Sequence, residues 1–393
     1  MNGLHSSVQS HCTQLAALTS RPTHPPSKRR CICTAADKDP LLLRVARGED
    51  AERTPVWLMR QAGRYMKAFR EYSDKYSFRD RSETTDIALR LSLQPWEAFQ
   101  PDGVIMFSDI LTPLPALGIE FDVVRGSGPI IEVPIRSMEQ VKALTPLEDP
   151  EAKLPFVQQT LAGIRSEVGN KATVLGFVGT PWTLAAYSIE GKADKHCTKT
   201  KTMMMKNPAV LHALLSHLAC NIADYVCYQI EAGAQVVQLF DSWAHHLNPS
   251  QFATFSLPYA EEVIQRVRKR HPDTPIIFHA NGGTGKHHLM KTSTADVIGL
   301  DWRCDIAHAR ANLGERTVQG NVDPTVLLGP QEGIQQAVHE CMAAAGPAGH
   351  ILNVGDGVTP NIPEENVAYF VQLATQQKHS HSQEQSDLAV AAS

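Results

Sequence analysis

The sequence predicts an α/β protein built as a single (β/α)8 TIM barrel, with its active site at the carboxyl ends of the strands. Eight short apolar runs, rich in β-branched residues, recur between residues 37 and 375. Helical patterns separate these runs, and polar residues follow them. Alternating buried strands and helices are typical of this barrel, whose catalytic loops follow the strands. A length of 393 residues is sufficient for one such domain.

The predicted strands are apolar at consecutive positions, as expected of parallel strands that are buried on both faces. They span residues 55–59, 103–107, 173–178, 236–240, 275–278, 296–300, 317–319 and 350–354. The clearest helix follows Asn207-Pro208, because proline is favoured in the first turn, and its apolar residues recur at helical spacing until Gly233. Polar residues at or near the strand ends predict one shared pocket, and they are Arg60, Arg64, Asp109, Tyr187, Asp241, Ser242, His279, Asp301, Asn321 and Asp356.

The two ends of the chain differ in composition from the predicted barrel at 37–375. Residues 1–36 contain no Asp or Glu, nine Ser or Thr, and four basic residues. Together with the lack of a continuous apolar stretch, this is typical of an organelle transit peptide. Weak amphipathicity favours the plastid (chloroplast stroma) over the mitochondrion, and a disordered tail is the alternative. Residues 376–393 are polar and then rich in small residues, which predicts a disordered C-terminal tail.

Charge and cysteine content exclude several classes of function. The chain has 37 Lys or Arg against 41 Asp or Glu, a net charge of −4, and removing the four basic residues of 1–36 leaves −8. This argues against nucleic-acid binding, which needs a basic face, and implies that individual arginines bind any anionic substrate. The sequence contains no run of about 18 apolar residues and therefore predicts no membrane span. The five cysteines beyond residue 36 form no CxxC pair, which excludes a zinc ribbon.

The run from Met59 to Tyr65, Met-Arg-Gln-Ala-Gly-Arg-Tyr, strongly resembles the signature of the uroporphyrinogen decarboxylase family. Further similar motifs follow in that family's order, at residues 107–111, 179–191, 238–244, 299–302 and 319–324. The resemblance implies a cofactor-free barrel enzyme, usually a homodimer. Such an enzyme converts uroporphyrinogen III into coproporphyrinogen III in haem and chlorophyll synthesis, a pathway that suits a plastid leader.

The implied reaction makes three demands on the protein. Loss of CO2 from a pyrrole acetate leaves a carbanion, and protonation of the pyrrole ring supplies the electron sink. The protein must therefore bind carboxylates, stabilise a ring cation and deliver protons. The resemblance assigns catalysis to Asp109, Arg60 and Tyr187, substrate binding to Arg60, Gln61, Ala62, Gly63, Arg64, Asp109, Tyr187, Ser242 and Asp356, and no residue to a metal.

The residue types fit these roles. Arg60 and Arg64 suit carboxylate binding, since guanidinium groups bind carboxylates with two hydrogen bonds. Asp109 suits the acceptance of pyrrole N–H groups and the stabilisation of the ring cation. Tyr187 and Ser242 carry hydroxyls that can orient carboxylates.

Three positions depart from the family's pattern. The family's Gly-His-Gly is Gly355-Asp356-Gly357 here, and an ionised Asp356 would repel a substrate carboxylate unless burial keeps it protonated. The usual Pro-Glu after the arginine signature is Lys67-Ala68, and His245-His246 follow Ala244 where a glycine is usual. These changes leave open a porphyrinogen-binding paralogue with impaired catalysis.

A third hypothesis is a zinc-dependent corrinoid or thiol methyltransferase of a related barrel family. That family holds zinc with a His-x-Cys motif after the fifth strand. This chain has His279-Ala280-Asn281 there, so the thiolate ligand is absent.

Overall fold

Seven parallel strands form a single curled sheet in the computed structural model, which describes residues 38–124 and 126–376. The strands run in the order β1 (Gly103–Ile105), β4 (Thr173–Gly179), β5 (Val236–Asp241), β6 (Ile276–Ala280), β7 (Val297–Gly299), β8 (Thr317–Gln319) and β9 (His350–Ile351). Seven of the eight predicted runs are therefore strands of this sheet. A separate antiparallel pair, β2 (Phe121–Val124) and β3 (Gly128–Ile131), lies outside it.

The prediction of a closed eight-stranded barrel is wrong at residues 55–59. This segment contributes one parallel bridge, between Val56 and Leu352, and no strand. Pro55 has no N–H to donate, and the N–H of Val56 donates to the side chain of Asp102 at 2.8 Å instead of to a backbone carbonyl. Hydrogen bonds from Leu352 N–H to Pro55 O and from Asp102 N–H to Val56 O still attach the segment to both edge strands. The sheet is thus barrel-like with an incomplete eighth position.

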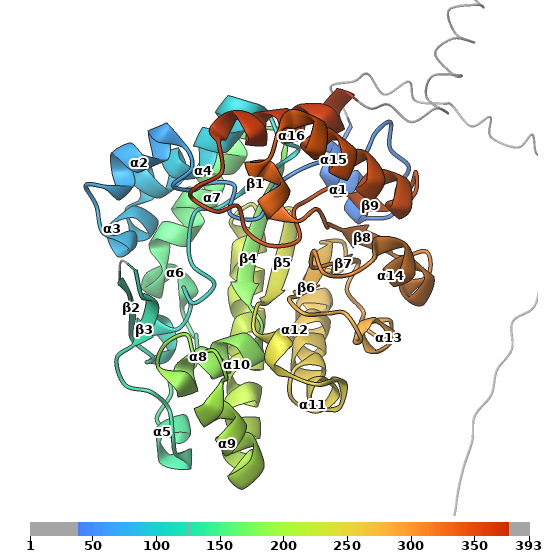
Figure 1. The fold of residues 1–393 in the computed structure, drawn as a ribbon. Coiled ribbons are helices and arrows are strands. Elements are labelled where there is room, and N and C mark those ends of the chain that lie inside the picture. Colours follow the sequence, from blue (N-terminus) through green and yellow to red (C-terminus); the bar gives the residue numbers. More distant parts are fainter. Residues whose placement is uncertain (1–37, 125, 377–393) are drawn as a thin grey trace, which may run out of the picture. The chain divides into compact units, whose positions relative to one another are not determined.

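Helices surround the sheet (Figure 1). They are α1 (Leu41–Ala46), α2 (Lys67–Ser73), α3 (Phe78–Glu83), α4 (Thr85–Phe99), α5 (Met138–Lys142), α6 (Pro150–Lys153), α7 (Pro155–Val168), α8 (Pro181–Glu190), α9 (Thr198–Lys206), α10 (Pro208–Glu231), α11 (Pro249–Phe255), α12 (Leu257–Arg270), α13 (His287–Met290), α14 (Ile306–Leu313), α15 (Gln331–Ala345) and α16 (Glu364–Gln376). Short 3-10 turns are η1 (Pro115–Leu117), η2 (Ala244–His246) and η3 (Pro324–Leu328). The helix predicted after Asn207-Pro208 is confirmed as α10, which packs against α8 and α12.

The inside of the curled sheet is filled by side chains. An apolar cluster that includes Trp57, Leu175, Ile277 and Val297 occupies it, and α1 packs against the same cluster. A polar layer lies among these residues: the indole N–H of Trp57 donates to Gln319 Oε1 at 2.8 Å, and Gln319 Nε2 donates to Gln238 Oε1 at 2.8 Å. Because α1 and this filling occupy the end where strands begin, the opposite end carries the loops that can form a site.

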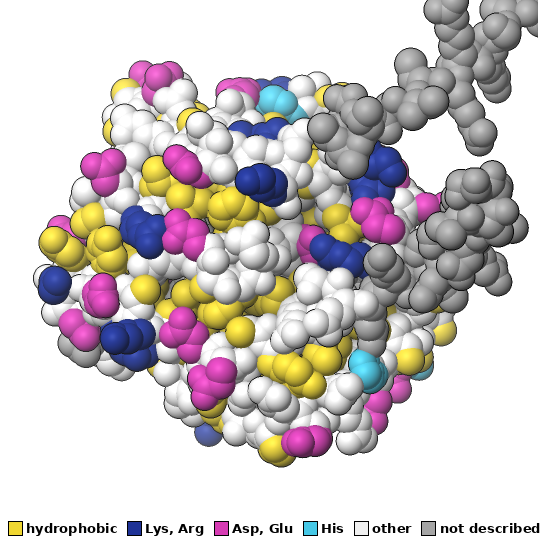
Figure 2. Space-filling view, turned by 90° about the horizontal axis from the view of Figure 1, so that it is seen from above, with side chains coloured by type: hydrophobic (Ala, Val, Ile, Leu, Met, Phe, Trp, Pro, Cys, Tyr) yellow, Lys and Arg dark blue, Asp and Glu magenta, His cyan; other side chains and the backbone are white. Residues whose placement is uncertain are grey.

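Helix α10 is long and apolar enough by length and composition to cross a membrane, but 61% of its apolar window is buried inside the protein. On the face at which the strands begin, basic and acidic side chains of the described residues are interspersed, with apolar side chains between them (Figure 2). This mixture agrees with the slightly acidic composition.

Two sequence predictions concern the chain ends. The predicted transit peptide, residues 1–36, lies outside the described residues. The predicted tail begins at Gln376, which is instead the last residue of α16, and residues 377–393 lie outside the described residues.

Candidate active site

The arginine loop, residues 59–65, is held in place by neighbouring side chains. The Gln61 side chain is buried, donating to the carbonyl of Gly103 at 3.0 Å and accepting from Leu58 N–H at 3.3 Å. The Tyr65 hydroxyl donates to the carbonyl of Gln61 at 2.6 Å. The predicted binding residue Gln61 therefore uses its side chain to fix the loop, and the partly buried Ala62 and Gly63 complete the turn.

Both arginines of this loop are exposed. Arg60 adopts a left-handed backbone conformation with φ of 58°, which is uncommon for a residue with a side chain. Within residues 38–124 and 126–376, neither Arg60 nor Arg64 forms an ion pair with an acidic side chain. Two guanidinium groups without carboxylate partners are suited to binding an anionic substrate.

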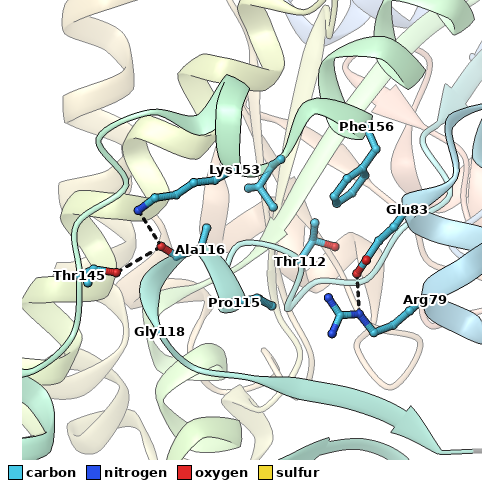
Figure 3. A pocket seen from close by; sticks show the side chains of 10 residues that line it. Arg79, Glu83, Thr112, Pro115, Ala116, Gly118, Thr145, Lys153 and Phe156 are labelled. Carbon is cyan, nitrogen blue, oxygen red and sulfur yellow. Dashed lines mark hydrogen bonds and ion pairs between the residues drawn. The ribbon is translucent and has the colours of Figure 1, made fainter.

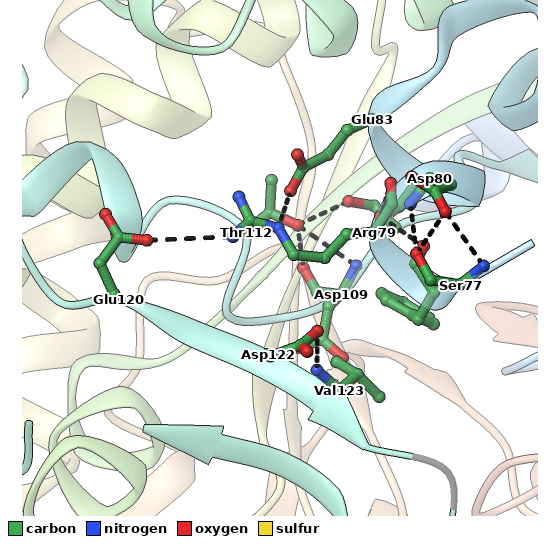
Figure 4. Close-up of polar contacts among 12 residues, drawn as sticks. Ser77, Arg79, Asp80, Glu83, Asp109, Thr112, Glu120, Asp122 and Val123 are labelled. Atoms are coloured by element: carbon green, nitrogen blue, oxygen red, sulfur yellow. Dashed lines mark hydrogen bonds and ion pairs between the residues drawn. The ribbon is translucent and has the colours of Figure 1, made fainter. Parts of the chain in front are cut away.

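Asp109 follows β1 and is held by a turn of its own (Figure 4). Its Oδ1 accepts from Leu111 N–H at 2.8 Å, while the Thr112 hydroxyl accepts from Asp109 N–H at 3.2 Å. No described residue forms a hydrogen bond with Oδ2 of Asp109. Burial raises the pKa of the Asp109 carboxyl, and the Leu111 hydrogen bond and the positive charge of Arg60 offset part of that rise. One oxygen thus remains available to a ligand.

Arg60, Asp109 and Tyr187 come together although they are far apart in sequence. Burial raises the pKa of the Tyr187 hydroxyl; the negative charge of Asp109 acts in the same direction, and the charge of Arg60 opposes it. Tyr187 belongs to α8, and its ring packs against Trp243 with centroids 4.4 Å apart. Ser242 precedes Trp243 after the end of β5. The arginine loop, the loop after β1 and helix α8 therefore bring an arginine, a carboxylate and a phenol close enough for their charges to interact.

Asp356 lies in a turn between two glycines, and each glycine lies close against a neighbouring loop. A Cβ at Gly355 would lie 2.1 Å from the backbone nitrogen of Trp302, and one at Gly357 would lie 2.2 Å from Cδ of Arg60. The exposed Asp356 side chain accepts from Gly357 N–H at 2.7 Å. The turn places Asp356 between the Trp302 loop and the arginine loop.

Two histidines experience the charge of Asp356, which opposes the lowering of their pKa values by burial. His245 is exposed, and its Nδ1 lies 3.1 Å from the carbonyl oxygen of Ser242. His279 is buried near the end of β6. The sequence predicts His279 as one of the polar residues at the strand ends that share a pocket, and it also considers His279 as a metal ligand; it assigns this residue no catalytic role.

Other polar residues at the strand ends stabilise the loops rather than face a shared pocket. Asp241 is fully buried and accepts from the hydroxyls of Thr180 and Thr183, both at 2.9 Å, and from Ser256. Burial raises the pKa of Asp241. Asp301 accepts from the N–H groups of Gly283 and Arg303, and Asn321 donates to the carbonyls of Asp301 and Cys304. The prediction that all the strand-end polar residues face one pocket is therefore wrong for Asp241, Asp301 and Asn321.

A cavity of about 400 Å³ lies beside the loop that carries Asp109 (Figure 3). Its charged side chains have partners: Arg79 pairs with Glu83 at 2.7 Å, and Lys153 donates to the carbonyl of Ala116 at 3.1 Å. The cavity shares only Thr112 with the surroundings of Asp109. Within residues 38–124 and 126–376, no three His, Cys, Asp or Glu side chains are grouped so that they could hold a metal ion.

Residues 37–377 match the uroporphyrinogen decarboxylase (URO-D) family. The chain is 56% identical over 337 residues to the uroporphyrinogen decarboxylase of Nostoc punctiforme, covering 85% of this chain and 95% of that protein. It is 54% identical over 345 residues to the uroporphyrinogen decarboxylase of Synechocystis sp., covering 87% and 98%. A solved methyltransferase from Methanosarcina mazei has a TM-score of 0.73 at 18% identity, covering 86% of this chain and 99% of that chain. That last likeness concerns the fold alone.

Proposed function

The chain belongs to the uroporphyrinogen decarboxylase family, and we propose that it converts uroporphyrinogen III into coproporphyrinogen III in tetrapyrrole biosynthesis. The observation that carries the proposal is the convergence of Arg60, Asp109 and Tyr187. Such a group offers a cation for substrate carboxylates, an anion for a ring cation and a hydroxyl for orientation.

Each decarboxylation consumes one proton. A pyrrole ring is protonated at carbon, the acetate loses CO2, and the bonding electron pair moves into the cationic ring to leave a neutral exocyclic methylene. Protonation of the methylene gives a methyl group, and loss of the ring proton restores the pyrrole. The sum for each acetate is R–CH2–COO⁻ + H⁺ → R–CH3 + CO2.

The residues take distinct parts in this sequence. Arg60 and Arg64 bind substrate carboxylates, since both guanidinium groups lack an acidic partner among the described residues. The free Oδ2 of Asp109 accepts pyrrole N–H groups, and the carboxylate stabilises the ring cation. The hydroxyl of Tyr187 donates to a carboxylate, since a tyrosine is protonated near neutral pH and burial raises its pKa further. Ser242 contributes a second hydroxyl beside it.

The remaining parts of the proposal rest on composition and on the family. Residues 1–36 act as a plastid transit peptide, because they are basic, rich in Ser and Thr, and free of acidic residues. Residues 37–375 form the catalytic domain, and the active protein is a homodimer. Import of the full chain into isolated plastids with shortening at the N-terminus tests the first point, and light scattering tests the dimer.

The deciding experiment is anaerobic turnover of uroporphyrinogen III by the full chain, with products separated by carboxyl number. Products with seven down to four carboxyls from the unmodified chain, and their loss in Asp109→Asn, support the function. If only Asp356→His produces them, the chain is a porphyrinogen-binding paralogue that is impaired at this position.

A further inference from the structure

His279 lies on the inner side of the curled sheet, one residue before the carboxyl end of β6. The strand register pairs His279 with Phe240 on β5 and with Gly299 on β7. Paired residues on neighbouring strands project to the same face, and Phe240 packs against the cluster inside the sheet. The rings of Phe240 and His279 meet edge to face, with centroids 6.0 Å apart. The imidazole is therefore directed to the inside of the sheet at the end that carries Arg60 and Asp109.

The surroundings of His279 leave room for the ring but give its Nδ1 atom no hydrogen-bond partner. A Cβ at Gly299 would lie 2.8 Å from Nδ1 of His279, so the absence of a side chain at Gly299 accommodates the imidazole. The residue is only 4% exposed, yet Nδ1 forms no hydrogen bond with any described residue. Buried polar atoms normally have partners, and an unpaired one at an active-site position indicates a ligand or a function.

Two carboxylates act on His279 from neighbouring loops. Burial lowers the pKa of its imidazole, while the charges of Asp356 and Asp301 and the adjacent backbone of Gly299 oppose that shift. Both oxygens of Asp301 accept backbone N–H groups, from Gly283 at 2.8 Å and from Arg303 at 2.9 Å. Asp356 is exposed and accepts one N–H, from Gly357. Of the two carboxylates whose charges act on His279, Asp356 is therefore the one that is open to solvent.

We propose that His279 protonates the exocyclic methylene formed when CO2 leaves, and that Asp356 is the positioning residue that favours its imidazolium and renews its proton from solvent. This inference rests on the proposed function. The imidazolium N–H transfers its proton to the methylene carbon, the neutral imidazole takes a new proton through Asp356, and the net consumption remains one proton per acetate. Substrate carboxylates add negative charge beside His279 and further favour the imidazolium.

The test compares His279→Gln, Asp356→Asn and the unmodified full chain in anaerobic steady-state turnover of uroporphyrinogen III between pH 5.5 and 8.5. His245→Gln is the matched control, because His245 also experiences Asp356 but is exposed. We expect His279→Gln to lower the rate by about 10²–10⁴-fold, with KM within threefold and no alkaline loss of activity arising from this group. The alkaline limb is the fall in rate at high pH. Asp356→Asn should shift this limb to lower pH, since removing the negative charge lowers the pKa of His279. His245→Gln should retain the rate within about twofold.

Several outcomes overturn the inference. If His279→Gln retains the rate within threefold, or loses activity while the alkaline limb persists, His279 is not the proton donor. If Asp356→Asn leaves that limb in place, Asp356 does not act on the donor; this variant alters an exposed side chain, so its fold is expected to survive. An unmodified chain without any product refutes the proposed function itself, and the role of His279 falls with it.

Discussion

Replacing Gly357 with alanine is expected to lower activity through Arg60 while leaving the fold intact. A Cβ at this position would lie 2.2 Å from Cδ, 2.7 Å from Cγ and 2.8 Å from Nε of Arg60. Carbon atoms in contact normally lie about 3.5–4.0 Å apart, so the Arg60 side chain must move by roughly 1.3 Å or more. Because that side chain is exposed and flexible, it moves in preference to the backbone.

The size of the effect follows from the role of the guanidinium. A hydrogen bond that involves a charged group contributes about 1.5–3 kcal/mol, and about 1.4 kcal/mol corresponds to a factor of ten. A displaced Arg60 therefore lowers kcat/KM for uroporphyrinogen III by about 10–100-fold. The melting temperature should change by less than about 2 °C, since the free energy of unfolding is little affected.

Two other glycines provide matched comparisons for this variant. A Cβ at Gly333 meets no atom within 4 Å, so Gly333→Ala should retain both activity and melting temperature. A Cβ at Gly355 meets the Trp302 backbone at 2.1 Å, and backbone cannot rotate away. Gly355→Ala should therefore lower the free energy of unfolding by about 1–3 kcal/mol or more.

The double variant Arg60→Ala/Gly357→Ala decides whether the effect passes through Arg60. If it does, the double variant has the same kcat/KM as Arg60→Ala alone. A further tenfold loss in the double variant would refute the reasoning, as would an unchanged kcat/KM in Gly357→Ala.

Three further predictions concern the carboxylates of Asp109 and Asp241. Asp109→Asn should lower kcat by about 10²–10³-fold in the anaerobic assay, and a loss of less than tenfold would contradict its role in stabilising a ring cation. Because burial raises the pKa of Asp109 above its value in the unfolded chain, its contribution to stability is greatest at low pH and is lost as the pH rises through the raised pKa. Asp109→Asn should therefore gain stability relative to the unmodified chain between pH 4 and pH 7 in urea unfolding, and a constant difference would refute this. Asp241→Ala leaves three hydroxyls without their acceptor and should cost about 2–4 kcal/mol, measured by the urea midpoint, whereas an unchanged midpoint would show that the network is dispensable.

Strand positions were predictable from the sequence because a sheet that is buried on both faces produces uniformly apolar runs. Residues 55–59 are equally apolar but do not form a strand, and the reason lies in a residue that is distant in sequence. The side chain of Asp102 accepts the hydrogen bond of the Val56 N–H, and no local sequence pattern reveals this contact. Pro55 was a local signal against a regular strand, since it cannot donate to the ladder.

The same uniform apolar pattern explains why the site was only partly predictable. It identifies where a strand ends but conceals which face each terminal residue occupies. Phe240 projects inward, whereas the next residue, Asp241, projects outward to Thr180 and Thr183. The convergence of Arg60 and Asp109 was predictable because both follow predicted strands of one barrel, whereas their separate roles came from the family motifs.

At position 356, the side chain can change, and with it the local charge, without a change in the fold. Gly355 and Gly357 fix the backbone of this turn, since each presses closely against a neighbouring loop and neither tolerates a Cβ without movement. The side chain between them is exposed, and within residues 38–124 and 126–376 its hydrogen bond is to Gly357 N–H, inside the turn. A histidine or an aspartate can therefore occupy this position with the same fold, while the charge presented to His279 changes from neutral or positive to negative. The altered residue is thus expected to affect the pH dependence of turnover far more than the stability of the protein.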